Sequence, residues 1–120
     1  MILVDTSIWV SHFRDGNPQL RDLLLNGQVA CHPFIVGELA CGNIKNREEI
    51  LSLLQELSVV TIADHMEVLH LIEQHRLMGI GLGYIDVHLL ASALLSGMPL
   101  WTRDKKLREV VIKLNISYIK

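Results

Sequence analysis

The chain has 120 residues, a length that corresponds to one domain, so we expect a single domain over residues 1–120 with one core and one site. Half of the residues are hydrophobic and 20% are charged, a composition that excludes a disordered tail. The formal net charge of −2 excludes a uniformly basic nucleic-acid coat protein. So high an apolar content in a short chain leaves two explanations open: a rich core, or an apolar surface covered by a second subunit or another partner.

The first half of the chain predicts strands that alternate with helices. A strand is favoured by the run Ile2-Leu3-Val4, which ends at Asp5, and the hydroxyls of Thr6 and Ser7 are suited to cap a helix that follows. Capping residues and hydrophobic spacing then predict a helix between Asn17 and Gly27, a strand over residues 29–31, a helix from Pro33 to Gly42 and an amphipathic helix over residues 47–57.

The second half continues the alternation. Asp64 and Glu67 resemble a capping box at the start of a long helix. The expected elements are a strand over residues 59–62, a helix from about 64 to 77, a glycine-rich turn over 79–83, a helix over 85–95, a strand over 100–102, a helix over 105–114 and a strand over 116–119. This order predicts an α/β fold, a three-layer α/β/α domain around a mainly parallel central sheet, with ligands at the carboxyl ends of the strands.

Neither end of the chain has the pattern of a targeting sequence or an anchor. Asp5 interrupts the apolar N-terminal run, and the charge-free stretch over residues 87–102 is shorter than the roughly 20 apolar residues that span a bilayer. Cys31 and Cys41 form no metal-binding or disulfide framework and are expected as small buried residues in a reducing compartment. We therefore expect a cytoplasmic protein with no membrane partner.

Four acidic residues occupy positions where a solvated surface charge is not the natural explanation. Asp5 and Asp104 follow predicted strands, which in a parallel sheet end at one edge. Glu38 interrupts the apolar side of a helix, and Asp86 lies in the first turn of another. Each acid alone is most simply a cap or a turn former, but together the four can converge on one site.

Converging carboxylates repel one another and raise one another's pKa unless a cation neutralises them. Carboxylate oxygens without accompanying thiolates suit Mg²⁺ or Mn²⁺, which can activate a water for attack on a phosphodiester. The hydroxyls of Thr6, Ser7 and Thr102 lie beside Asp5 and Asp104 and are placed to orient a water or a phosphate oxygen. The spacing leaves a metal site and four separate caps as open alternatives.

The histidines do not form a second candidate site. His65, His70 and His75 recur every five residues, which scatters their side chains around a helix rather than gathering them on one face. His88 is two residues from Asp86 and favours a structural role or a dimer contact. Tyr84, beside Asp86, is a candidate for contact with a substrate or a second subunit.

Four segments taken in order resemble the successive motifs of PIN-domain nucleases. They run from Ile2 to Trp9, from Gly37 to Ala40, from Gly83 to Ala91 and from Leu100 to Asp104. More narrowly, the chain resembles the VapC-like ribonuclease toxins of bacterial type II toxin–antitoxin pairs. The resemblance covers essentially the whole chain, and its combined motifs are far more specific than any one of them.

The resemblance implies a Mg²⁺- or Mn²⁺-dependent endoribonuclease. The catalytic and metal-binding acids would be Asp5, Glu38, Asp86 and Asp104, and the supporting catalytic hydroxyls those of Thr6, Ser7 and Thr102. It also implies an RNA substrate, a homodimer and a cognate antitoxin whose tail occupies the active-site groove. One departure concerns Lys106, which stands where many relatives carry a further acid or amide, so we expect one firmly held ion rather than two.

The charge is unevenly distributed along the chain. Residues 1–100 hold five Lys or Arg against eleven Asp or Glu, whereas residues 101–120 hold six against two. The cations that surround Asp104 place positive charge beside the expected site, and we interpret them as substrate-binding residues: Arg103, Lys105, Lys106 and Arg108.

Two other functions compete with the nuclease. A PIN-like binding protein would keep the fold without the chemistry, although all four expected acids are present. A phosphoacceptor receiver domain shares the length and the α/β layout, but residues 59–63 supply no acceptor Asp after the predicted central strand. The metal-dependent nuclease remains the leading hypothesis.

Overall fold

A computed structural model describes residues 1–118, and the chain alternates strands and helices as the sequence predicts. Capping explains several helix starts: Asn17 accepts a hydrogen bond from the Leu20 amide, and Asp64 and Glu67 form the expected capping box. The elements are β1 (Ile2–Val4), α1 (Thr6–Asp15), α2 (Pro18–Leu25), β2 (Val29–Cys31), α3 (Pro33–Ala40), α4 (Arg47–Gln55), β3 (Ser58–Val59), α5 (His65–His75), α6 (Tyr84–Ser96), β4 (Leu100–Trp101) and α7 (Lys105–Lys113).

The four strands form one parallel sheet in the order β3-β2-β1-β4. Its centre is completely apolar, because every residue of β1 and β2 is buried. In β1, Leu3 pairs with Leu100 and Val4 with Trp101, so β1 and β4 end side by side. Residues that follow these two strands therefore start from the same edge of the sheet.

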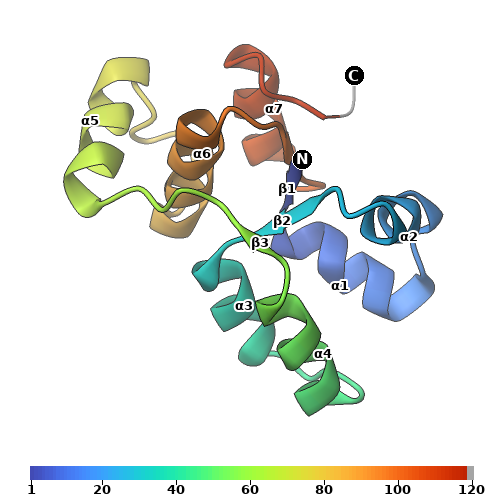
Figure 1. The fold of residues 1–120 in the computed structure, drawn as a ribbon. Coiled ribbons are helices and arrows are strands. Elements are labelled where there is room, and N and C mark those ends of the chain that lie inside the picture. The colour runs from blue at the N-terminus through green and yellow to red at the C-terminus, as the bar shows by residue number, and fades with distance from the viewer. Residues whose placement is uncertain (119–120) are drawn as a thin grey trace.

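Helices lie on both sides of the sheet, as the predicted layers require. Figure 1 shows α5 and α6 to one side of the strands and α1 and α2 to the other, with α3 and α4 below them. The helix α6 lies deep in the molecule, because all seven residues from Val87 to Ala93 are buried. The first turn of α6, which carries Asp86, lies at the end of this buried segment, and the packing of the segment fixes the position of the turn.

Two strand predictions are wrong in extent. The strand expected over residues 59–62 is the two-residue β3, an edge strand that is paired on one side only and whose two residues are exposed. The strand expected over 116–119 is reduced, within the described residues, to one bridge between Ser117 and Leu100; the prediction for Ile119 lies outside them. The hydroxyls of Thr6 and Ser7 do not cap α1 either, since they bond to acidic side chains instead.

The two cysteines differ in environment. Cys31 is buried in β2, which raises the pKa of its thiol to about 11, whereas Cys41 is exposed and the prediction of burial is wrong for it. Both are free thiols. Over residues 1–118, the longest helix is too short to cross a membrane.

Candidate active site

Asp5 lies at the centre of the candidate site, directly after β1. Its side chain is 6% exposed, and its Oδ2 accepts hydrogen bonds from Ser7 Oγ at 2.8 Å and Thr102 Oγ1 at 2.7 Å. The backbone holds Asp5 next to Thr102, because the Asp5 amide donates to the Trp101 carbonyl across the parallel strand pair at 2.9 Å. The two hydroxyl donors satisfy this buried oxygen and fix the orientation of the carboxylate.

Asp104 is joined to Asp5 through Thr102. The Asp104 amide donates to Thr102 Oγ1 at 3.0 Å, and the same hydroxyl donates to Asp5. Asp104 also caps α7, since its Oδ1 accepts from the Leu107 amide at 2.9 Å. Oδ1 of Asp104 therefore caps the helix, and Oδ2, which has no hydrogen-bond partner among the described residues, can serve the site.

Asp86 comes to the site from α6. Its Oδ2 accepts from the Gly83 amide at 2.9 Å, which anchors the side chain at the start of the helix. Burial raises the pKa of the Asp86 carboxyl, the Gly83 hydrogen bond opposes this shift, and the nearby charges of Asp5 and Asp104 raise the pKa further. Asp5 and Asp104 are therefore close enough for their charges to act on Asp86.

Glu38 extends the site towards α3. Thr6 Oγ1 donates to Glu38 Oε1 at 2.8 Å, so the residue next to Asp5 holds the fourth acid. Glu38 itself is exposed, and it does not contribute to the electrostatic shift of Asp86. It lies at the edge of the site rather than at its centre.

The four carboxylates share one pattern. Each has one oxygen anchored by a hydrogen bond and a second oxygen without a hydrogen-bond partner among the described residues. Within the same residues the only ion pair joins Arg14 to Asp15 at 3.0 Å, so no Lys or Arg neutralises the four acids. The site holds negative charge that its own side chains leave uncompensated.

The donor chemistry fits a hard divalent cation, although no preformed cage exists. Within residues 1–118, no three His, Cys, Asp or Glu side chains are grouped closely enough to hold a metal ion as they stand. Mg²⁺ needs no such cage, since proteins bind it through one or two carboxylates while it keeps several waters. The free oxygens of Asp5, Asp86 and Asp104 are of the type required.

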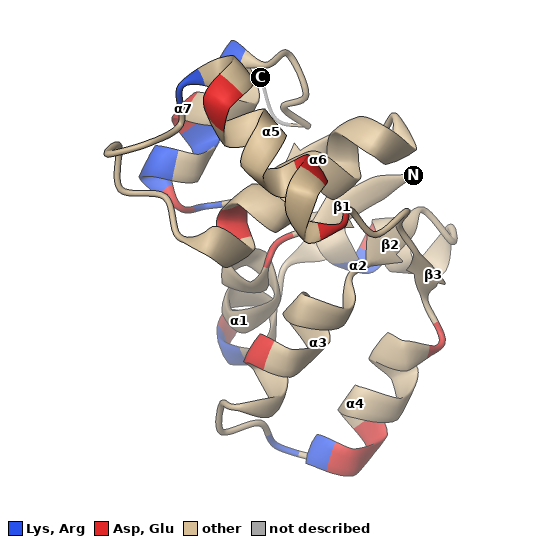
Figure 2. Ribbon diagram, turned by 90° about the vertical axis from the view of Figure 1, so that its left-hand side faces the viewer, with Lys and Arg blue, Asp and Glu red and all other residues tan. Residues whose placement is uncertain are grey.

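Predicted substrate-binding cations surround the acids on the α7 side. Figure 2 shows Lys and Arg gathered on α7 and on the segment before it, beside acidic segments of neighbouring elements. Arg103 is fixed in place, because its amide donates to Ser7 Oγ at 3.0 Å and its guanidinium to Ser11 Oγ at 2.6 Å. Lys106 lies across the backbone of Gly81, in the turn before α6. Lys105 and Arg108 are exposed in the first turn of α7.

An aromatic and histidine cluster supports the start of α6. The Tyr84 hydroxyl lies 2.6 Å from His65 Nδ1 and 3.0 Å from His88 Nε2, which ties α6 to α5. His88 is buried against Phe34 and 6.1 Å from the ring of His32, as its expected structural role requires. The sequence analysis missed His32, which caps α3 through its ring nitrogen and is 1% exposed; its place before Pro33 was the available signal.

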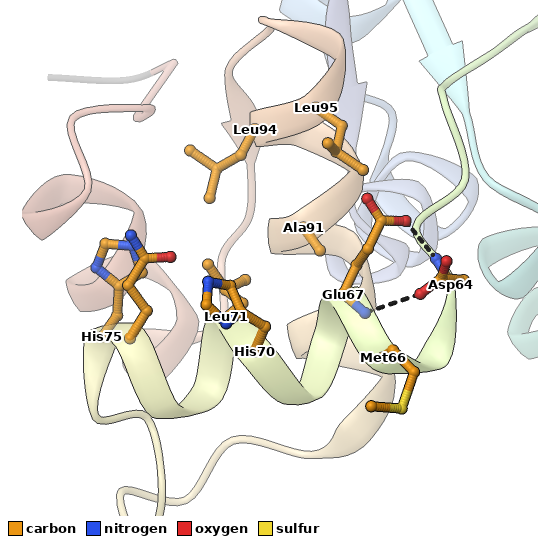
Figure 3. Close-up of a pocket in the computed structure, with 10 residues that line it drawn as sticks. Asp64, Met66, Glu67, His70, Leu71, His75, Ala91, Leu94 and Leu95 are labelled. Carbon is orange, nitrogen blue, oxygen red and sulfur yellow. Dashed lines mark hydrogen bonds between the residues drawn. The ribbon is translucent and has the colours of Figure 1, made fainter.

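An apolar groove lies away from the acids, between α5 and α6. It has a volume of about 450 Å³, and Figure 3 shows Leu94 and Leu95 of α6 facing Leu71 and His70 of α5 around it. Its walls contain none of the four candidate acids. His70 and His75 both line this groove.

The fold and the site define a parallel α/β domain that gathers acidic side chains at the carboxyl edge of its sheet. The chain belongs to the PIN-domain family, whose model matches residues 2–113. It is 48% identical over 109 residues to proteins named ribonuclease VapC32 in two strains of Mycobacterium tuberculosis, CDC 1551 / Oshkosh and H37Rv, an alignment that covers 90% of this chain and 88% of each relative.

Solved structures have the same fold. A toxin–antitoxin complex from Klebsiella pneumoniae contains a chain that superposes with a TM-score of 0.68 at 22% identity, over 88% of each chain. The PAE2754 protein of Pyrobaculum aerophilum superposes with a TM-score of 0.60 at 17% identity, over 95% of this chain and 88% of the other. At these identities the similarity confirms the predicted architecture.

Proposed function

We propose that the protein is a metal-dependent endoribonuclease and the toxin of a type II toxin–antitoxin pair. One observation carries the chemistry: burial, and then the nearby charges of Asp5 and Asp104, raise the pKa of Asp86, and among the described residues no Lys or Arg forms an ion pair with these three acids. The name of the relatives at 48% identity supports RNA as the substrate. A site with this uncompensated negative charge would bind a divalent cation, which assists the cleavage of a phosphodiester bond.

The residues that would hold Mg²⁺ or Mn²⁺ are Asp5, Asp86 and Asp104, with Glu38 at the edge. Such an ion, when bound, supplies an acidified water and offsets the charge that develops on the attacked phosphate. The protein's own contribution is to hold the carboxylates still. Ser7 and Thr102 fix Asp5, the Gly83 amide fixes Asp86 and Thr6 fixes Glu38, so each free oxygen has a defined direction.

The cations of α7 would bind the RNA beside the acids. Arg103, Lys105, Lys106 and Arg108 follow Thr102 and surround Asp104, where they offset the repulsion between the acidic site and a polyanion. These contacts reach phosphates and carry no base identity, so they position the strand without selecting a sequence.

Two protein partners complete the proposal, a second copy of the chain and a cognate antitoxin. The toxin–antitoxin complex from Klebsiella pneumoniae supports the antitoxin through the shared fold. Large apolar side chains remain exposed on several helices, among them Leu25, Leu53, Met66 and Leu95, which favours the covered-surface explanation of the apolar content. The oligomeric state, measured by light scattering, and co-purification with the product of the adjacent gene test the two partners.

The activity is tested with purified protein and total RNA. We expect cleavage with Mg²⁺ or Mn²⁺, none in EDTA, and a loss of at least 100-fold in Asp5→Asn and in Asp86→Asn. Asp22→Asn is the matched control, because Asp22 is exposed on α2 and makes no side-chain hydrogen bond to the described residues. Full cleavage in EDTA contradicts the metal-dependent mechanism, and no cleavage with any divalent ion favours a PIN-fold binding protein.

A further inference from the structure

A groove of about 650 Å³ begins at Glu38 and follows α1 to the loop between α3 and α4. Unlike the groove between α5 and α6, it includes one of the candidate acids in its wall. At this end Glu38 accepts a hydrogen bond from Thr6, the residue next to Asp5. The groove is therefore continuous with the place where we propose that the phosphodiester is cleaved.

One face of α1 forms the length of this groove. Thr6 precedes Val10 by four residues, and Phe13 and Arg14 follow Val10 by three and four, so all of them share one side of the helix with Val10; the last three line the groove. From Thr6 to Arg14 the helix axis rises roughly 12 Å, at about 1.5 Å for each step between residues. That length accommodates a short single-stranded segment rather than a single small molecule.

The far end of the groove is positively charged. Arg14 and Lys45 both line it, and within residues 1–118 Arg14 has only the exposed Asp15 as an ion-pair partner, a pair that water screens strongly. Arg47 holds the loop in shape, because its guanidinium donates to the carbonyls of Gly42 and Ala40. The loop therefore presents Lys45 from a constrained backbone.

The remaining lining side chains are the aliphatic Val10, Leu39, Ile44 and Ile50, together with three that can contact nucleobases. Phe13 is half-buried and offers an aromatic ring, and the amides of Asn43 and Asn46 both donate and accept hydrogen bonds. Cations for phosphates, an aromatic ring for stacking and amides for base edges are the components with which proteins bind single-stranded RNA.

The groove and the cations of α7 lie at opposite ends of the acidic site. Hydrogen bonds run from Asp104 through Thr102 to Asp5, and the neighbouring Thr6 connects to Glu38. Figure 2 shows α7 in the upper part of the view and α1 and α3 side by side below it. A strand that crosses the acids thus meets positive charge on both sides.

We propose that this groove binds the single-stranded RNA segment adjacent to the cleaved bond, with Arg14 and Lys45 on its phosphates and Phe13 against a base. The inference rests on the proposed nuclease function and adds to it a second subsite, which continues the strand beyond the α7 cations. Arg14 and Lys45 at the far end favour a polyanion, and Glu38 at the near end places the strand beside the candidate acids. Binding of the antitoxin tail in this groove is the alternative that the test distinguishes.

The test compares two double variants that remove the same charge. Arg14→Gln/Lys45→Gln removes the groove cations, and Arg21→Gln/Arg76→Gln removes two exposed cations remote from the site. The probe is a fluorescein-labelled 12-nucleotide single-stranded RNA of randomised sequence, and its dissociation constant is measured by anisotropy in EDTA from 50 to 300 mM salt. Cleavage of total RNA by each protein in Mg²⁺ is followed in parallel.

We expect the groove variant to bind the RNA at least fivefold more weakly and to lose about 1.4 from the slope of log affinity against log salt, since each single-strand phosphate contact contributes roughly 0.7. The control should shift the dissociation constant less than twofold at an unchanged slope. Equal losses in both variants overturn the subsite, as does a groove variant that binds RNA normally but no longer binds the antitoxin. Wild-type protein that neither binds nor cleaves RNA refutes the nuclease function itself, whereas cleavage with no effect of the groove variant refutes the subsite alone.

Discussion

Thr102 Oγ1 donates a hydrogen bond of 2.7 Å to Asp5 Oδ2 and accepts one of 3.0 Å from the Asp104 amide. One buried hydroxyl therefore connects two acids from neighbouring strands. We predict that Thr102→Val, which keeps the shape and removes the hydroxyl, lowers the free energy of unfolding by about 1–3 kcal/mol, because the Asp104 amide and the Asp5 carboxylate each lose a partner. Urea denaturation measures the change.

The same substitution should lower RNA cleavage by at least tenfold, because Asp5 then has one anchoring hydroxyl instead of two. Thr102→Ser is the matched control, since it retains the donor and acceptor. Equal activity in the Val and Ser variants would mean that the hydroxyl has no part in positioning Asp5.

Asp86 gives a prediction with opposite signs for stability and activity. Burial raises the pKa of its carboxyl in the folded state, so the wild-type protein loses stability as pH rises from the ordinary value of 3.8 through the raised pKa. Asp86→Asn removes this titration and keeps an oxygen that accepts from the Gly83 amide. In EDTA at pH 7 the variant should unfold at a higher urea concentration than wild type, while its RNA cleavage is lost. A variant less stable than wild type at pH 7 argues against the electrostatic origin of the shift.

Much of the site followed from the sequence because it depends on where strands end. Asp5 and Thr102 follow β1 and β4, and the pairing of adjacent parallel strands brings them together whatever the details of the helices. Asp86 was predictable for a related reason, since its position in the first turn of a deeply buried helix fixes its direction.

Other features depend on long-range packing that local patterns do not encode. Residues 59–62 have the composition of a buried strand. However, this segment lies at the edge of the sheet, and the strand ends at Val59. The groove beside Glu38 requires α1 and the loop before α4 to meet, and the cations Arg14 and Lys45 are 31 positions apart. The spacing of Val10, Phe13 and Arg14 on α1 can be read from the sequence, but the opposite side of the groove, formed by the loop before α4, cannot.

His32 predicts how stability depends on pH. Burial, with a smaller contribution from His88, lowers the pKa of its ring from 6.5 to about 4. The unfolded chain therefore takes up a proton below pH 6.5 while the folded protein does not, so stability falls as pH drops from 6.5 to about 4. At about 1.4 kcal/mol per pKa unit, this loss amounts to about 3 kcal/mol.

His32→Asn tests this origin, because Asn retains a side-chain acceptor for the Phe34 amide at the start of α3 but does not titrate. The loss of stability between pH 6.5 and 4, measured by urea denaturation, should shrink in this variant. His70→Asn, on the exposed face of α5, should keep the wild-type profile. If both variants retain the wild-type loss, other groups determine the acid sensitivity.

The contact between Gly81 and Lys106 can be tested by substituting Gly81, with the same substitution at Gly79 as the matched control. Gly79 and Gly81 have positive φ angles of 71° and 91°, so Ala at either position costs about 1–2 kcal/mol of backbone strain. Only at Gly81 would the added Cβ collide with a side chain, reaching 2.6 Å from Lys106 Cδ, whereas nothing lies within 4 Å at Gly79. Gly81→Ala must therefore displace the Lys106 side chain, and Gly79→Ala leaves it in place.

We expect Gly81→Ala to lower kcat/KM for RNA cleavage about as much as Lys106→Ala, by three- to tenfold, through loss of a phosphate contact beside the acids. Gly79→Ala should remain within twofold of wild type. In the double variant Gly81→Ala/Lys106→Ala the two losses should not multiply, because the glycine acts through the lysine. Multiplying losses would show instead that the turn shapes the first turn of α6 and Asp86 directly.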